Sequence, residues 1–124
     1  MIVKIAKGIW LISMMGSVTV LLYAYASLRD AGGVTRTFGP EQVTFLGRSQ
    51  WTSPRTRATW PVAQEIRIAD RVFVTQPLMN DQELDSRLTT GAVYWEGASE
   101  LFEGERRVGR GYLEMTGYVA PIRL

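Results

Sequence analysis

The sequence predicts a mainly β protein in which one N-terminal transmembrane helix precedes a small antiparallel β-domain. Two observations lead to this fold class. A run without charged residues extends from Gly8 to Leu28, and a helix rising about 1.5 Å per residue would carry it across the roughly 30 Å hydrocarbon layer of a bilayer. The rest of the chain alternates apolar and polar residues between glycines and prolines, which is typical of short strands.

The uncharged run has three interpretations. Trp10, Tyr23 and Tyr25 near its ends favour a retained membrane anchor, because amphipathic rings prefer the headgroup zone. Lys4 and Lys7 before it, with a small-x-small pattern at residues 24–26, are also typical of a cleaved signal peptide. The valine- and leucine-rich residues 17–22 fit a buried strand. We expect the anchor. Its residues for packing against neighbouring helices would be Trp10, Ser13, Gly16, Ser17 and Tyr23.

The two lysines set the orientation of this helix. Lys4 and Lys7 precede the run, and positive charge is retained on the cytoplasmic side. We therefore expect a single-pass protein of a bacterial inner (cytoplasmic) membrane, with a cytoplasmic N-terminus and a periplasmic C-terminal domain. The expected organisation is the anchor over residues 1–28, a linker and edge strand over residues 29–50, and a periplasmic β-domain over residues 51–124.

The composition excludes several kinds of site. Cysteine and histidine are both absent, so thiol nucleophiles, histidine-based triads and ordinary zinc sites are not available. The 14 basic residues are interspersed with 12 acidic ones and form no stripe, which argues against a nucleic-acid partner. We expect no ligated cofactor and no metal.

Strand signals dominate the middle of the chain. Gly39-Pro40 predicts a turn before an edge strand at residues 43–46, and residues 79–90 read as a loop or a single helical turn. Residues 62–68 and 72–75 flank Asp70-Arg71 and predict a half-buried hairpin. The alternation places Ile66, Ile68, Val72 and Val74 on one face of it.

The last part of the chain predicts a second, longer hairpin. Residues 92–102 and 108–119 are both β-like, and the charged connector between them contains Gly104. The two runs should pair antiparallel. In the second run the alternation places Tyr112, Glu114, Thr116 and Tyr118 on one face and Leu113, Met115 and Val119 on the other.

Four motifs occur in order along residues 45–119. They are Trp51-Thr52-Ser53-Pro54, Asp81-Gln82-Glu83-Leu84, Tyr94-Trp95-Glu96-Gly97, and Gly109-Arg110-Gly111-Tyr112-Leu113-Glu114 followed by Thr116-Gly117-Tyr118. Together they resemble the carboxy-terminal part of the AttH-like lipocalin family, which includes the carotenoid 1,2-hydratases (hydroxyneurosporene synthases). The resemblance implies a partial lipocalin-like β-domain, since members of that family are longer and build two lipocalin-like units. The sequence departs from the family pattern at Arg57, where glycine is expected, at Trp60, where tyrosine is usual, and at Gln64, near a usual tryptophan.

The resemblance also supplies candidate catalytic residues. Hydration of a double bond needs an acid that protonates carbon. The candidate acids are Asp81, Glu83, Glu96 and Glu114, with Tyr94, Tyr112 and Tyr118 as hydrogen-bonding partners. However, carboxylates that alternate along strands usually form a solvated face, and the segment 81–84 equally suits a loop that caps backbone amides. We therefore expect a degenerate, non-catalytic domain.

Two further groups of side chains have a functional and a structural interpretation. Trp51, Trp60 and Trp95 would line a groove for a hydrophobic ligand or fill the core of a small β-domain, and the core is favoured. A basic group at the second hairpin would bind an acidic partner or form a soluble tip, and the tip is favoured. Its members are Arg106, Arg107 and Arg110.

The leading functional hypothesis is a non-catalytic accessory subunit that stabilises a larger membrane complex. A partial β-unit leaves sheet edges that invite a partner, and a small domain gains stability by association. Because carotenoid hydratases belong to phototrophic bacteria, the resemblance suggests a reaction-centre and light-harvesting complex. The expected partners are other membrane-protein subunits and the lipid bilayer, with contact to carotenoid or bacteriochlorophyll held by those subunits. The alternative is a membrane-anchored carotenoid hydratase-like enzyme or a lipid- or carotenoid-binding lipocalin-like protein.

Overall fold

The computed structural model describes residues 2–5, 9–16 and 21–119, with side chains from residue 25 onward. Its strands are β1 (Ile2–Ile5), β2 (Ile9–Gly16), β3 (Leu21–Arg29), β4 (Thr35–Phe38), β5 (Val43–Thr52), β6 (Thr59–Ile68), β7 (Arg71–Pro77), β8 (Glu83–Ser86), β9 (Ala92–Glu103) and β10 (Arg106–Thr116). A short 3-10 turn, η1 (Pro40–Gln42), precedes β5 at the predicted Gly39-Pro40 turn. The described chain is therefore mainly β, as predicted.

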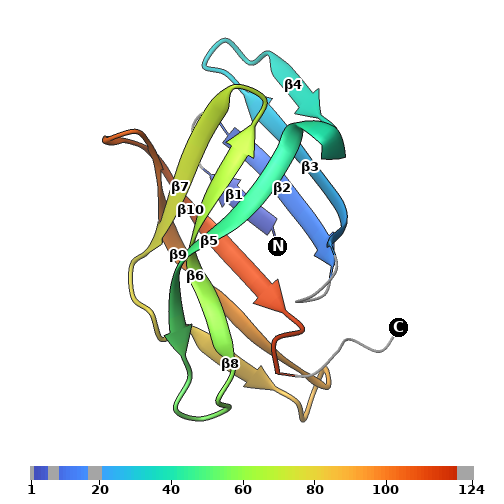
Figure 1. The fold of residues 1–124 in the computed structure, drawn as a ribbon, viewed down its shortest axis with the longest axis vertical. Helices are drawn as coiled ribbons and strands as arrows, with labels where there is room; N and C mark the ends of the chain where they lie inside the picture. Colours follow the sequence, from blue (N-terminus) through green and yellow to red (C-terminus); the bar gives the residue numbers. More distant parts are fainter. Residues whose placement is uncertain (1, 6–8, 17–20, 120–124) are drawn as a thin grey trace.

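All ten strands belong to one antiparallel sheet. Their order is β4-β3-β2-β1-β10-β9-β7-β6-β5, and β8 pairs with β9. The sheet is strongly curved, and β5 and β6 lie in front of β2 and β3 in Figure 1. We call the concave side of the sheet, where the buried hydrophobic residues lie, the enclosed side. Near one end β3 contacts β5 and η1 directly. The edge strand predicted at residues 43–46 is confirmed, because β5 lies at one end of the strand order.

The predicted N-terminal helix is wrong for the residues that the structure describes. Residues 9–16 and 21–29 form the antiparallel pair β2 and β3, in which Ser13 is opposite Tyr25. No helix in the described part of the chain has the length and apolarity needed to cross a bilayer. Four of the expected helix-packing residues, Trp10, Ser13, Gly16 and Tyr23, lie in these strands, whereas Ser17 falls outside the described residues.

The physical reason is that an apolar run does not by itself distinguish a helix from a buried strand. Strands that are paired on both sides satisfy their backbone groups within the sheet, and burial then favours an uncharged composition. Leu21 and Leu22, which the strand interpretation included, do lie in β3, although residues 17–20 are outside the described residues. Ala26 and Leu28, expected in the anchor, are buried in the same core as Trp60.

The first predicted hairpin forms, but its facing residues differ from the prediction. A two-residue turn at Ala69-Asp70 places Ile68 opposite Arg71 and Ile66 opposite Phe73. Even-numbered residues of β6 therefore share a face with odd-numbered residues of β7. Phe73 is fully buried, whereas Val72 lies on the outer face and is 40% exposed.

The 79–90 segment is a strand in part, not only a loop. Residues 83–86 form β8, which continues along the same edge of β9 that β7 occupies further on. The second hairpin forms as predicted: β9 pairs with β10 through a turn at Gly104-Glu105, with Leu113 and Met115 buried. Its last two assignments are wrong, because β10 ends at Thr116. Tyr118 packs against Trp60 in the core, and Val119 is 37% exposed.

One hydrophobic core lies on the enclosed side of the sheet. Its residues come from strands at both ends of the strand order, which ties the curved sheet together. They are Ala26, Leu28, Val43, Ala58, Trp60, Val62, Ile66, Ile68, Phe73, Val93, Trp95, Leu101, Leu113 and Met115.

Candidate functional site

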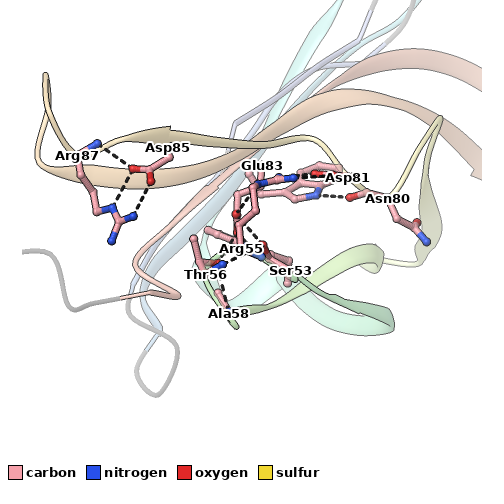
Figure 2. A network of polar contacts seen from close by, with 11 residues as sticks. Ser53, Arg55, Thr56, Ala58, Asn80, Asp81, Glu83, Asp85 and Arg87 are labelled. Carbon is pink, nitrogen blue, oxygen red and sulfur yellow. Dashed lines mark hydrogen bonds and ion pairs between the residues drawn. The ribbon is translucent and has the colours of Figure 1, made fainter.

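The Glu83 carboxylate is the centre of a polar network at one end of the sheet. Its side chain is completely buried where β8 begins, and both oxygens accept hydrogen bonds. Ser53 Oγ donates to Oε1 at 2.7 Å, while Thr56 Oγ1 and Trp60 Nε1 donate to Oε2 at 2.7 and 2.8 Å. Figure 2 shows Ser53 and Thr56, from the β5–β6 turn, beside the Glu83 carboxylate of β8. Trp60 comes from β6. The network joins two segments that are far apart in the sequence.

The turn that carries Ser53 is arranged to present these donors. Ser53 Oγ also accepts from the backbone amides of Arg55 and Thr56 at 3.2 and 3.3 Å, and the Arg57 amide donates to the Ser53 carbonyl at 3.0 Å. Pro54 follows Ser53 in this turn, where no backbone donor is needed. The short Trp51-Thr52-Ser53-Pro54 motif therefore ends β5 and positions a hydroxyl for Glu83.

Arg55 adds a more exposed ion pair to the network. Its guanidinium donates two hydrogen bonds to the Asp81 carboxylate, at 2.8 and 2.5 Å, and its Nε lies 3.6 Å from Glu83 Oε1. The hydrogen bond from Arg55 lowers the pKa of Asp81, and the same bond raises the pKa of Arg55. A separate pair, Asp85 with Arg87, lies further along the segment (Figure 2).

The Gln82 side chain hydrogen-bonds to the backbone of β9 between the part of that strand that pairs with β7 and the part that pairs with β8. Its Oε1 accepts from the Ala98 amide at 2.9 Å, and its Nε2 donates to the carbonyls of Met79 and Ala98 at 2.9 and 3.2 Å. The side-chain amide thus replaces the missing backbone neighbour. A Cβ at Gly97 would collide with the Gln82 amide, so the glycine in one motif makes room for the glutamine in another.

Two of the three candidate tryptophans are buried in the hydrophobic core, and the third packs against it. Trp60 and Trp95 are both fully buried, and each indole N–H has an acceptor: Glu83 for Trp60, and the Asn80 carbonyl at 2.7 Å for Trp95. Tyr118 packs on Trp60 with ring centroids 5.0 Å apart, and burial raises the pKa of its hydroxyl. Trp51 is half-buried against the same core.

The candidate acids Glu96 and Glu114 lie elsewhere, on the outer face of the sheet. They are directly opposite each other on β9 and β10. Tyr112, also on this face, donates a short hydrogen bond to Glu96, and burial together with that bond raises the pKa of Tyr112 to about 12. Tyr94 shares this outer face of β9, between buried Val93 and Trp95. The four candidate acids are therefore not brought into one site.

The basic group at the second hairpin is bound to carboxylates. Arg107 and Arg110 both donate to Glu100, at 2.8 and 3.2 Å, and Arg106 lies 3.6 Å from Glu103. Two motif glycines lie nearby: Gly109 at a register shift of β10, and Gly111 opposite Ser99. Gly117, just after β10, has a φ of 88°, a conformation that favours glycine. No group of three candidate metal ligands occurs among the residues that the structure describes.

Three neutral polar residues that were not predicted as a group, Gln64, Thr75 and Ser99, face the enclosed side. Thr75 Oγ1 accepts a hydrogen bond from the backbone N–H of Gln64 at 3.0 Å. The side-chain Nε2 of Gln64 donates to the Pro61 carbonyl at 3.2 Å. Ser99, on β9, is 3% exposed, and its Oγ is the one buried side-chain polar atom in the described part of the chain without a hydrogen-bond partner. The alternation of β6, β7 and β9 carries the signal, since each polar residue occupies an inward position.

Arg57 has a φ of 65°, which lies in the left-handed region. This is the position at which the family pattern expects glycine. Glycine adopts this conformation without a steric penalty, whereas a side chain is strained there. The turn therefore retains the shape that glycine suits, although the residue is arginine.

Comparison with known proteins places these motifs in a family. The AttH-like family model matches residues 10–118. This chain belongs to the AttH-like family. The crystal structure of a protein assigned as AttH from Nitrosomonas europaea is 49% identical, with a TM-score of 0.80 over 84% of this chain and 32% of that one. Comparison with curated protein sequences gave no match.

A second solved structure shares the AttH-like fold. Kievitone hydratase from Nectria haematococca matches with a TM-score of 0.65 at 18% identity, over 96% of this chain and 39% of that one. At this identity the likeness concerns the fold alone. The chain spans about a third of the length of the solved structures that it matches.

Proposed function

We propose that this chain is a non-catalytic, lipocalin-like binding protein whose enclosed side holds an apolar ligand, such as a carotenoid or a lipid, with one hydrogen-bonding group. The observation that carries the proposal is a buried, neutral hydroxyl on the enclosed side that has no hydrogen-bond partner among the described residues. Gln64, Thr75 and Ser99 are neutral, and the Ser99 hydroxyl has no partner among the described residues. Glu83, opposite Trp95, also faces this side, but its carboxylate is taken up by Ser53, Thr56 and Trp60. The remainder of that face is the hydrophobic core.

The candidate acids argue against catalysis of hydration. A general acid must hand its proton to the substrate and needs an oxygen within reach of it. Both Glu83 oxygens are engaged by Ser53, Thr56 and Trp60, and the Asp81 carboxylate is held by Arg55. Glu96 and Glu114 lie on the opposite side of the sheet. These contacts favour a structural role for all four carboxylates.

The unpartnered Ser99 hydroxyl favours binding. A buried polar group without a hydrogen bond is unfavourable by about 1–3 kcal/mol, so it is retained at a cost unless something bonds to it. A ligand with a hydroxyl or carbonyl oxygen would supply that bond, while its apolar part would contact the core. Ser99 would then distinguish a ligand with such an oxygen from its parent hydrocarbon.

Fluorescence titration tests this proposal, because Trp60 and Trp95 are buried in the same core and report on the interior. The ligands are a dihydroxy carotenoid and its parent hydrocarbon. We expect both to quench tryptophan emission in the wild type. Ser99→Ala should weaken binding of the dihydroxy carotenoid about fivefold, which corresponds to one hydrogen bond of about 1 kcal/mol, and leave the hydrocarbon unchanged. Ser49→Ala, at an exposed serine of β5, is the matched control.

Two results would contradict the proposal. Absence of quenching by either carotenoid and by a fatty acid would exclude binding on the enclosed side. Formation of a hydrated carotenoid by the wild type, abolished by Glu83→Gln in a chain that still folds, would make the protein an enzyme instead.

The role of an accessory subunit in a photosynthetic membrane complex stays a prediction. It rested on open sheet edges, on the small size of the domain and on the N-terminal helix, and residues 9–16 and 21–29 do not form that helix. Mild detergent extraction followed by native separation would test it, since comigration with a pigmented complex is the expected result.

A further inference from the structure

We propose that the outer face of β9 and β10, with the adjoining end of β7, is a self-complementary surface that pairs with a second copy of this chain. This inference is independent of the ligand proposed above, because it concerns the opposite face of the sheet. It rests on an exposed apolar row, on a fixed aromatic side chain within that row, and on the charges to each side of it.

An apolar row crosses three neighbouring positions of this face. Tyr112 on β10 is opposite Ala98 on β9, and the Leu78 amide donates to the Ala98 carbonyl at 3.0 Å. Leu78 is 57% exposed and Tyr112 is 42% exposed. Exposed apolar side chains that adjoin one another, unlike isolated ones, are typical of an interaction surface.

Tyr112 is fixed in its position before any partner binds. Its hydroxyl donates to Glu96 on the neighbouring strand, which directs the ring toward β9. Aromatic residues are enriched at the centres of protein interfaces, and a side chain that is already ordered loses little entropy on association. Tyr112 is therefore suited to be the anchor of the contact.

The charges differ on the two sides of this row. Toward the hairpin tip, Arg107 and Arg110 share the single carboxylate of Glu100, so positive charge is in excess. On the other side, Glu96 and Glu114 are directly opposite each other. Like charges at opposed positions are destabilising in a sheet, and no arginine contact to either glutamate occurs among the described residues.

A two-fold axis along the apolar row brings these two sides together. Rotation about this axis places Tyr112 and Leu78 of each copy against the row of the other. It also places the side with Arg107 and Arg110 over the side with Glu96 and Glu114 of the second copy. Such an isologous contact closes as a dimer, and the charge pattern sets its orientation.

Sedimentation velocity over a range of about 1–100 µM tests the proposal with the full chain. We expect the wild type to form a dimer that weakens as salt rises, since exposed charges are screened. Leu78→Ser should raise the dimer dissociation constant about tenfold. Leu46→Ser is the matched control, because Leu46 is 59% exposed on β5, outside the row, and should leave dimerisation unchanged.

Charge reversal distinguishes a self-complementary dimer from other associations. Arg110→Glu and Glu114→Arg should each weaken the dimer about tenfold, and the double variant should recover most of the wild-type affinity. Circular dichroism of each variant checks that the fold is retained. A wild type that is monomeric over the whole range, a dimer as sensitive to Leu46→Ser as to Leu78→Ser, or a double variant without recovery would each overturn the proposal.

Discussion

Two pairs of carboxylates from the family motifs lie in contrasting environments. Asp81 and Glu83 bind donors from the β5–β6 turn at one end of the sheet, and the Glu83 side chain is completely buried. Glu96 and Glu114 lie opposite each other on an exposed face. A carboxylate that belongs to a family motif therefore does not have the same structural role in every motif. The first pair joins segments of the chain, whereas the second leaves unbalanced charge at the surface.

The sharpest test of this comparison removes one carboxylate from each pair. Glu83→Ala should lower the free energy of unfolding by about 3 kcal/mol, because it leaves the Ser53, Thr56 and Trp60 donors buried without an acceptor. Glu114→Ala should change it by less than about 0.5 kcal/mol. Urea denaturation measures both. Equal losses would show that the two pairs do not differ.

A second test concerns the close contact between Gln82 and Gly97, which allows the 79–82 segment to lie against β9. Gly97→Ala should destabilise the protein by about 2 kcal/mol, because the added methyl group collides with the Gln82 amide. In a double-mutant cycle, the cost of Gly97→Ala should fall when Gln82 is already alanine. An unchanged cost would locate the strain elsewhere.

The Asp81–Arg55 pair predicts a smaller, pH-dependent effect. The pKa of Asp81 is lowered in the folded protein, so its stabilisation is complete above the unfolded pKa near 4 and is lost as the pH falls through the lowered folded value. Asp81→Asn should cost about 0.5 kcal/mol at pH 7, since both side chains are about half exposed. Thermal unfolding should show this difference vanish at acidic pH. A difference that persists there would not come from the ion pair.

The smallest predicted effect is a stabilisation, whereas the preceding variants destabilise the protein. Arg57→Gly should stabilise the turn that supplies the Glu83 donors by about 0.5 kcal/mol. Relief of the left-handed conformation, worth about 1–2 kcal/mol, exceeds the added flexibility of glycine in the unfolded chain, about 0.5–1 kcal/mol. Glu105→Gly, at an exposed turn position of the second hairpin without a positive φ, is the control and should not stabilise. Thermal unfolding distinguishes the two variants.

Much of the fold could be predicted from local patterns. The Glu103–Arg106 turn, the pairing of β9 with β10 and the buried positions of Leu113 and Met115 follow from alternation and from Gly104. Alternation within each strand does not show how many residues the turn between them contains. The prediction therefore placed Val72 on the buried face, where the structure has its neighbour Phe73. It also could not reveal β8, because that strand is short and polar and is defined by pairing with β9.

The sequence by itself determined the β class, the second hairpin and the family, because alternation and motif spacing are local properties of the chain. Only the tertiary structure decided that residues 9–16 and 21–29 are strands, since an apolar run forms a helix or a strand according to the neighbours that it pairs with. It alone also brought Ser53 to Glu83 and separated Glu83 from Glu96. Those contacts depend on the curvature and register of the sheet, which involve residues distant in the sequence.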